Sequence, residues 1–171
     1  MAKAMRHKCI GYAIIVLVFF VLQTSSDSIC RAFGFTPNFL LLLTIAVAFR
    51  ESETFAAFFG LICGLLYDLT TQTGVGMRAV LFMFGAYLLS IALQTVFRPL
   101  FLSYVYVCLG ALALEGLFDY LFYILLNDAL PFRVAFINIM LPRFLLSGAW
   151  SYAVYYVVYR FNLSLKRRGI L

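Results

Sequence analysis

The stretch FTPNFLLLLTIAVAFRESETFAAFFGLICGLLYDL, residues 35–69, decides the fold. It contains two apolar runs, about 35–50 and 54–69, which only the polar residues around 50–53 separate. A helix needs roughly 20 residues to cross a bilayer core of about 30 Å. Both runs are therefore short for membrane spans, and we expect local thinning of the bilayer or burial of these helices inside a bundle.

The rest of the chain has the same character. Hydrophobic residues make up 65% of the 171 residues, charged residues only 12%, and the mean hydropathy is +1.02. Globular domains average about 45–50% apolar and about 25% charged residues. This composition excludes a soluble catalytic or binding domain and predicts one integral membrane domain over residues 1–171.

Six apolar segments follow one another along the chain, at about 9–26, 35–50, 54–69, 79–97, 100–126 and 134–159. We expect an all-α polytopic protein, a compact bundle of six transmembrane helices. Pro142 lies inside the sixth segment, where the missing backbone donor predicts a kink.

Basic residues are distributed unequally between the two sides of this predicted bundle. If both tails are cytoplasmic, nine Lys and Arg residues lie inside and three outside, in agreement with the positive-inside rule. Because these residues flank spans, we read them as topology signals rather than as a nucleic-acid site. The tail residues could also contact lipid headgroups or a cytoplasmic partner. They are Lys3, Arg6, Lys8, Arg160, Lys166, Arg167 and Arg168.

The fifth segment contains two acids, Glu115 and Asp119, four residues apart and hence on one helix face. Each costs roughly 2.5–3.5 kcal/mol near the bilayer centre, so this face should point inward. Arg143 is the expected partner, the one basic residue that the segments place at membrane depth. Three interpretations remain open: a structural ion-pair network, protonated acids without a partner, and a site for a ligand or a partner subunit.

The third segment offers further polar and small residues. Gly60 and Gly64 form a small-xxx-small pair that lets two helices approach closely. Asp68 could cap the following turn, pair with Arg78 of the loop at 70–78, or lie solvated at the interface.

Catalytic and metal-binding patterns are missing from the sequence. The lone histidine, His7, lies in the basic tail, and no HExxH, GxSxG, P-loop or CxxC pattern occurs. We expect no enzyme activity, no metal site and no cofactor.

One region resembles a known family. Pro37-Asn38 precedes the second segment, a glycine-rich third segment ends in Asp68, and Gly-Val-Gly-Met-Arg leads into the fourth. This order resembles the bacterial rod shape-determining protein MreD over roughly a third of the chain. The resemblance carries over, as positions shaping the fold and a partner surface, to Pro37, Asn38, Gly60, Gly64, Asp68, Gly74, Gly76 and Arg78.

The resemblance implies a non-enzymatic scaffold subunit of the machinery that elongates the cell wall, in the bacterial inner membrane. Its implied partners are MreC, a single-span protein, together with the glycosyltransferase RodA, a penicillin-binding transpeptidase and the nearby actin-like MreB. Membrane lipids surround it, and no nucleic acid is expected. The rival interpretation is a substrate-capture subunit of an energy-coupling vitamin transporter, with Glu115, Asp119 and Arg143 lining an outward pocket.

Overall fold

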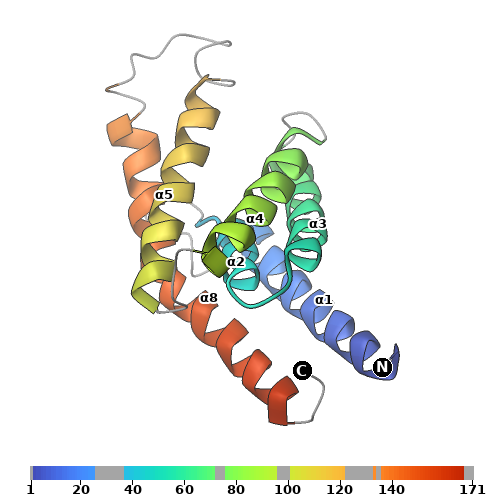
Figure 1. Ribbon diagram of the computed structural model, residues 1–171. Helices are drawn as coiled ribbons and strands as arrows, with labels where there is room; N and C mark the ends of the chain where they lie inside the picture. Colours follow the sequence, from blue (N-terminus) through green and yellow to red (C-terminus); the bar gives the residue numbers. More distant parts are fainter. Residues whose placement is uncertain are drawn as a thin grey trace.

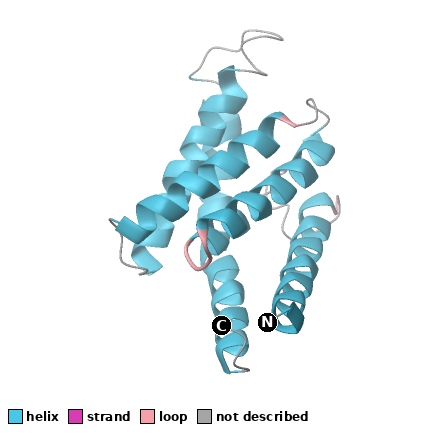
Figure 2. Ribbon diagram, turned by 45° about the vertical axis from the view of Figure 1, so that its right-hand side comes forward, coloured by secondary structure: helices cyan, strands magenta, loops and turns pink. Residues whose placement is uncertain are grey.

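A computed structural model describes residues 2–25, 37–71, 76–95, 101–121, 133 and 136–167 of the chain. These residues include six α-helices and, directly before α8, a π-helical turn, and the described part of the chain contains no strand (Figure 2). The helices are α1 (Ala2–Thr24), α2 (Phe39–Ala48), α3 (Glu53–Thr71), α4 (Met77–Thr95), α5 (Phe101–Asp119) and α8 (Leu141–Arg167), and the π-helical turn is η3 (Phe136–Met140). The all-α prediction is confirmed.

Three of these helices are long and apolar enough to cross a membrane: Arg6–Thr24 of α1, Glu53–Thr70 of α3 and Leu102–Asp119 of α5. The apolar parts of α2 and α4, Phe39–Ala48 and Met77–Leu93, are shorter. Such helices indicate a membrane protein.

The short helix α2 is the centre of the fold. All ten of its residues are buried, and α1, α3, α4, α5 and α8 all contact it. Figure 1 shows α3 and α4 on one side of α2 and the α5–α8 pair on the other. A helix that is apolar on every face is stable only inside a protein or a membrane, and α2 is enclosed by its neighbours.

Helix α2 is shorter than the predicted segment 35–50, because Pro37 and Asn38 precede it in a non-helical conformation. The Asn38 side chain accepts a hydrogen bond from the Leu41 amide at 3.1 Å, the usual action of an N-cap. Gln23 Oε1 accepts another from the Leu40 amide at 3.2 Å, so α1 helps to satisfy the free amides at this helix end.

Two glycines allow α3 and α4 to pack closely. A Cβ on Gly60 would lie 2.6 Å from the Phe82 carbonyl oxygen, and one on Gly64 would lie 2.8 Å from the Arg78 carbonyl oxygen. Since these neighbours are backbone atoms, no larger residue fits without moving α4. The pair therefore acts as a small-xxx-small contact.

The other helix bounds also differ from the predicted segments. Helix α1 begins at Ala2 and α8 extends to Arg167, so residues expected to lie in tails continue the helices. Pro142 lies in the first turn of α8, directly after the π-helical turn. The hydrogen-bond pattern of the helix thus changes next to Pro142, whose backbone has no donor.

Both chain ends lie at the same end of the bundle in Figures 1 and 2, where α1 begins and α8 ends. The turn between α2 and α3 lies toward this end as well, whereas α3 leads to α4 at the opposite end (Figure 1). Lys3 lies in the first turn of α1, and Lys166 and Arg167 lie in the last turn of α8. Gly74 and Arg168 lie outside the described residues.

Candidate functional site

Polar side chains from five segments meet beside the N-terminus of α2. We call this group the Asp119 cluster. Its members are Asn38, Tyr67, Arg78, Glu115, Asp119 and Arg143.

Asp119 bridges two guanidinium groups from different helices. Its Oδ1 accepts from Arg78 Nη2 of α4 at 2.6 Å, and its Oδ2 accepts from Arg143 Nη1 of α8 at 3.0 Å. The side chain of Arg78 is only 4% exposed and that of Asp119 17%. One carboxylate therefore joins α4, α5 and α8 through two charge-assisted hydrogen bonds.

Glu115 lies one helical turn from Asp119 and connects α5 to the start of α2. Its Oε1 accepts from Asn38 Nδ2 at 2.6 Å and lies 3.5 Å from Arg143 Nη2. The backbone N–H of Asn38 donates to the Ser147 hydroxyl at 3.0 Å, so Asn38 is also bound to α8. Asn38, expected as a family-motif position, thus caps α2 and connects its start to α5 and α8.

Tyr67 of α3 completes the cluster. Its hydroxyl accepts a hydrogen bond from Arg143, and its ring centre lies 4.6 Å from the Arg78 guanidinium carbon. A cation over an aromatic face is favourable, more so when water is excluded, and Tyr67 is 2% exposed. No pattern in the sequence indicates this role, because a tyrosine in an apolar run is usually a packing residue.

The structure places the three intramembrane candidates, Glu115, Asp119 and Arg143, in one network. It also adds a second cation that the sequence interpretation placed in the outer loop. Arg78 lies in the first turn of α4 and is 3% exposed, so Arg143 is not the only basic residue in the interior.

Asp68 caps the start of α4. Its Oδ2 accepts from the Gly76 amide at 2.8 Å and from the Ala79 amide at 3.3 Å. Gly76 has φ +110°, a conformation that residues with a side chain rarely adopt. Of the alternatives for Asp68, capping of the following turn is the one that these hydrogen bonds show, and a solvated acid is wrong since Asp68 is 1% exposed.

A second polar group, which we call the Glu51 cluster, lies at the other end of α2. Glu51 forms an ion pair with Lys8 of α1 and accepts from the Tyr12 hydroxyl at 2.8 Å. Tyr12 in turn accepts from Asn162 Nδ2 of α8 at 2.9 Å. The Glu51 side chain is 3% exposed, so this acid joins α1 and α8 to the turn after α2.

The Glu51 cluster changes the interpretation of one tail residue. Lys8 was expected to contact headgroups or a partner, but its side chain is 16% exposed and paired with Glu51. Arg6 and Arg160 remain exposed at the same end of the bundle, and Arg160 lies 5.8 Å from the Tyr156 ring centre.

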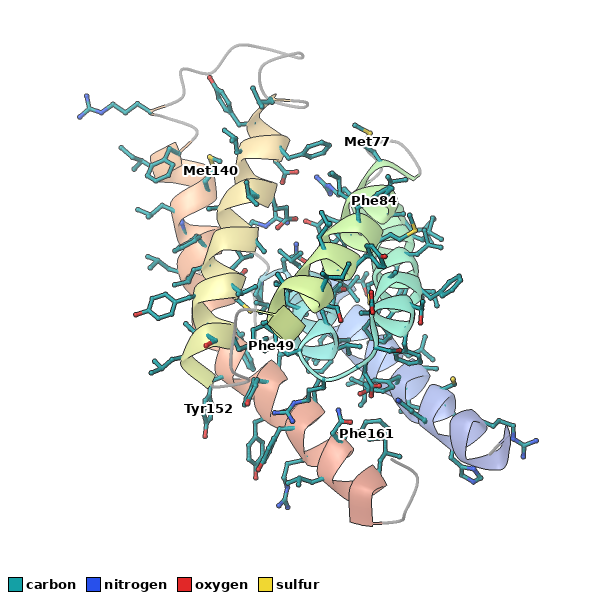
Figure 3. The ribbon with its side chains drawn as sticks, in the orientation of Figure 1. Phe49, Met77, Phe84, Met140, Tyr152 and Phe161 are labelled. Carbon is teal, nitrogen blue, oxygen red and sulfur yellow. The ribbon has the colours of Figure 1, made fainter. Side chains whose placement is uncertain are left out.

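A cavity of about 410 Å³ lies between α5 and the η3–α8 segment. Glu115, Asp119 and Arg143 form its polar wall. The apolar wall consists of Leu112, Leu117, Phe136, Met140, Leu141 and Phe144. Figure 3 shows Met140 at this seam, and Met140 Cε occupies the space that a Cβ on Gly116 would need, at 2.9 Å.

The arrangement can hold helices together and can accept an amphipathic ligand, because the cavity combines an apolar wall with charged groups. Within the described ranges, no group of three or more His, Cys, Asp or Glu side chains is arranged to hold a metal ion.

Comparisons of the chain with protein-family models, with curated proteins and with solved structures found no match.

Proposed function

We propose that this chain is a non-enzymatic scaffold subunit, similar to MreD, of the machinery that elongates the bacterial cell wall. In this proposal the protein crosses the cytoplasmic membrane six times with both termini in the cytoplasm. It binds an MreC-like single-span protein and so helps to organise a RodA-type glycosyltransferase and a penicillin-binding transpeptidase near MreB.

The proposal rests on one observation: residues that carry the resemblance to MreD cap and pack the helices of this fold. Asn38 caps the central helix, Gly60 and Gly64 set the approach of α4 to α3, and Asp68 caps α4. Each of these residues thus has a role in building the α2–α4 region that its residue type explains, which supports the scaffold proposal.

The position of the chain ends also supports the proposed topology. An even number of spans returns the chain to the side where it began, and α1 begins where α8 ends (Figure 1). Exposed Arg6 and Arg160 lie at this end, and cytoplasmic ends of spans are enriched in Lys and Arg. Tyr152 and Tyr156 of α8 are 62% and 49% exposed, as expected of an interfacial aromatic belt.

A scaffold needs stable helix faces rather than a reaction centre. The two polar clusters lock α2 against α1, α5 and α8, which leaves the outward faces of α3 and α4 apolar and exposed. Examples are Phe58, Leu69, Phe84 and Leu88. Partner helices that replace lipid on such faces gain packing contacts without new polar groups.

Depletion of the protein in its own cells tests this proposal. The expected result is loss of rod shape, restored by the wild-type chain and by a Gly85→Ala variant, since nothing lies within 4 Å of a Cβ at Gly85. Cells that keep their rod shape and their normal rate of lateral wall synthesis after depletion contradict the scaffold role.

The cavity favours a second candidate function, substrate capture for an energy-coupling vitamin transporter. Its volume of about 410 Å³ falls in the range of about 300–1,000 Å³ typical of small-molecule sites. A large rise in the melting temperature of the purified protein on addition of one water-soluble vitamin would support capture. Absence of any shift over a panel of vitamins counts against it.

A further inference from the structure

The two carboxyl groups at the cavity between α5 and α8 are not paired equally with arginines. Its wall carries the carboxyl groups of Glu115 and Asp119 but only one guanidinium, that of Arg143. Arg78 neutralises Asp119 from the α4 side and does not line the cavity. Because Arg143 lies 3.0 Å from Asp119 and 3.5 Å from Glu115, Glu115 is the less fully paired of the two acids.

Glu115 has an unused acceptor at this wall. Both of its hydrogen bonds use Oε1, and Oε2 has no hydrogen-bond partner among the described residues. The side chain is 9% exposed and is part of the cavity lining. Since Oε2 is not fully enclosed by the protein, a ligand in the cavity can donate a hydrogen bond to it.

The remaining surface of the cavity determines what else the ligand must be. Three lining residues have much accessible surface: Leu117 and Phe136 are 44% exposed and Leu141 is 38% exposed. Leu114, on the same helix, is 70% exposed. Because α5 is long and apolar enough to span a membrane, this seam faces acyl chains rather than water. The ligand should therefore enter from the bilayer.

We propose that the cavity binds a phospholipid whose headgroup ends in a primary ammonium, with the ammonium donating to Glu115 and an acyl chain along the apolar wall. The phosphate of such a lipid finds a cation in Arg143, whose side chain is 26% exposed. An anionic phospholipid lacks a group for Glu115 and meets its charge unfavourably. A choline headgroup keeps the positive charge but has no N–H to donate.

This inference is independent of the scaffold proposal, but it gives the cavity a different ligand from the one in the capture proposal. A scaffold can carry a bound lipid, and the lipid can fail to bind while the cell still requires the protein for its shape. The two outcomes are distinguishable because one is measured on purified protein and the other in cells.

Native mass spectrometry of the full-length protein in nanodiscs of defined lipid tests the proposal. The discs contain phosphatidylethanolamine, phosphatidylcholine and phosphatidylglycerol in equal parts, and the retained lipid is identified after release from the disc. We expect phosphatidylethanolamine to be retained preferentially on the wild-type chain. A hydrogen bond to a charged group supports a preference of about tenfold.

Two variants with matched controls localise the binding. Glu115→Gln removes the charge but keeps an acceptor for Asn38, and Glu53→Gln removes a carboxylate on α3, far along the chain from the cavity wall. Ala113→Trp places a large ring at the cavity lining, and Leu114→Trp places the same ring on the exposed neighbouring position. The preference should disappear in the first member of each pair and persist in the second.

Equal retention of all three lipids by the wild-type chain overturns the proposal, as does preferential retention of phosphatidylglycerol. Retention of the ethanolamine lipid by both Glu115→Gln and Ala113→Trp also overturns it, because the lipid then binds elsewhere. If Glu115→Gln does not fold, Ala113→Trp against Leu114→Trp still decides the result, since neither changes a charge.

Discussion

Removal of the Asp119 carboxylate should destabilise the protein more than removal of either charge that it contacts. Asp119→Ala breaks two ion pairs, with donor–acceptor distances of 2.6 and 3.0 Å. It leaves two guanidinium groups facing one another, and Glu115, 3.5 Å from Arg143, is the remaining carboxylate near them. Because the Arg78 side chain is 4% exposed, water cannot replace the lost partner.

The expected cost is about 3–5 kcal/mol, the usual range when one member of a buried pair is removed. For a chain of this size, that corresponds to a fall in melting temperature of about 6–20 °C. Arg143→Met should cost less, since Asp119 keeps its shorter ion pair with Arg78. The double variant should cost less than the sum of the two single changes, because it removes the surplus positive charge.

Unfolding of the purified protein from mild detergent into a denaturing detergent, followed by circular dichroism, measures these four free energies. Glu53→Ala is the control, since Glu53 has no ion pair with any described residue. Surface changes usually alter the free energy of unfolding by less than about 1 kcal/mol. If Asp119→Ala changes it by no more than that, the cluster does not hold the helices together. Strict additivity of Asp119→Ala and Arg143→Met would equally refute the reasoning.

Three further changes test other contacts of the fold. Gly64→Ala should lower the free energy of unfolding by about 1–3 kcal/mol, since its Cβ would meet backbone atoms of α4 at 2.8 Å; the matched Gly85→Ala change, into open space, should be neutral. Asp68→Ala should cost about 0.5–2 kcal/mol through loss of the cap on α4, and Asp68→Asn less, because an acceptor oxygen remains; equal losses in thermal melts would argue against capping. Glu51→Gln should lower the free energy of unfolding by about 1–3 kcal/mol, because it leaves the amine of Lys8 without its carboxylate. A second change, Lys8→Met, should restore part of that free energy in the same assay. A further decrease would contradict the ion pair.

Local periodicity in the sequence was sufficient to predict the helices and one part of the Asp119 cluster. Apolar runs broken by short polar connections indicated helices throughout. The four-residue spacing of Glu115 and Asp119 placed both on one face of α5, and the cost of burying them pointed to Arg143. In the structure Arg143 contacts both carboxylates.

Local periodicity could not predict contacts between residues that lie far apart in the sequence. Arg78 was assigned to a loop, because the positive φ of Gly76, which lets α4 begin at Met77, is not visible in the sequence pattern. Glu51 resembled an ordinary residue of a charged connection. Its burial depends on Lys8, 43 residues earlier, and on Tyr12, 39 residues earlier.

The length of α2 was predicted wrongly for a related reason. Hydropathy alone extended the segment back to residue 35, whereas Asn38 ends it by capping the helix. The capping preference of asparagine is a local signal, but the acceptors of its other two hydrogen bonds, Glu115 and Ser147, lie on α5 and α8. The shortened helix is stable because those partners reach it.

Identification of the proteins that bind this chain tests the scaffold proposal most directly. The protein is purified in mild detergent from the cells that produce it, and the co-purifying proteins are identified by mass spectrometry. The proposal predicts a single-span protein with a large extracytoplasmic region, accompanied by wall synthases. Recovery of two ATPases with another membrane subunit, in place of these partners, would contradict it and identify the chain as a capture subunit.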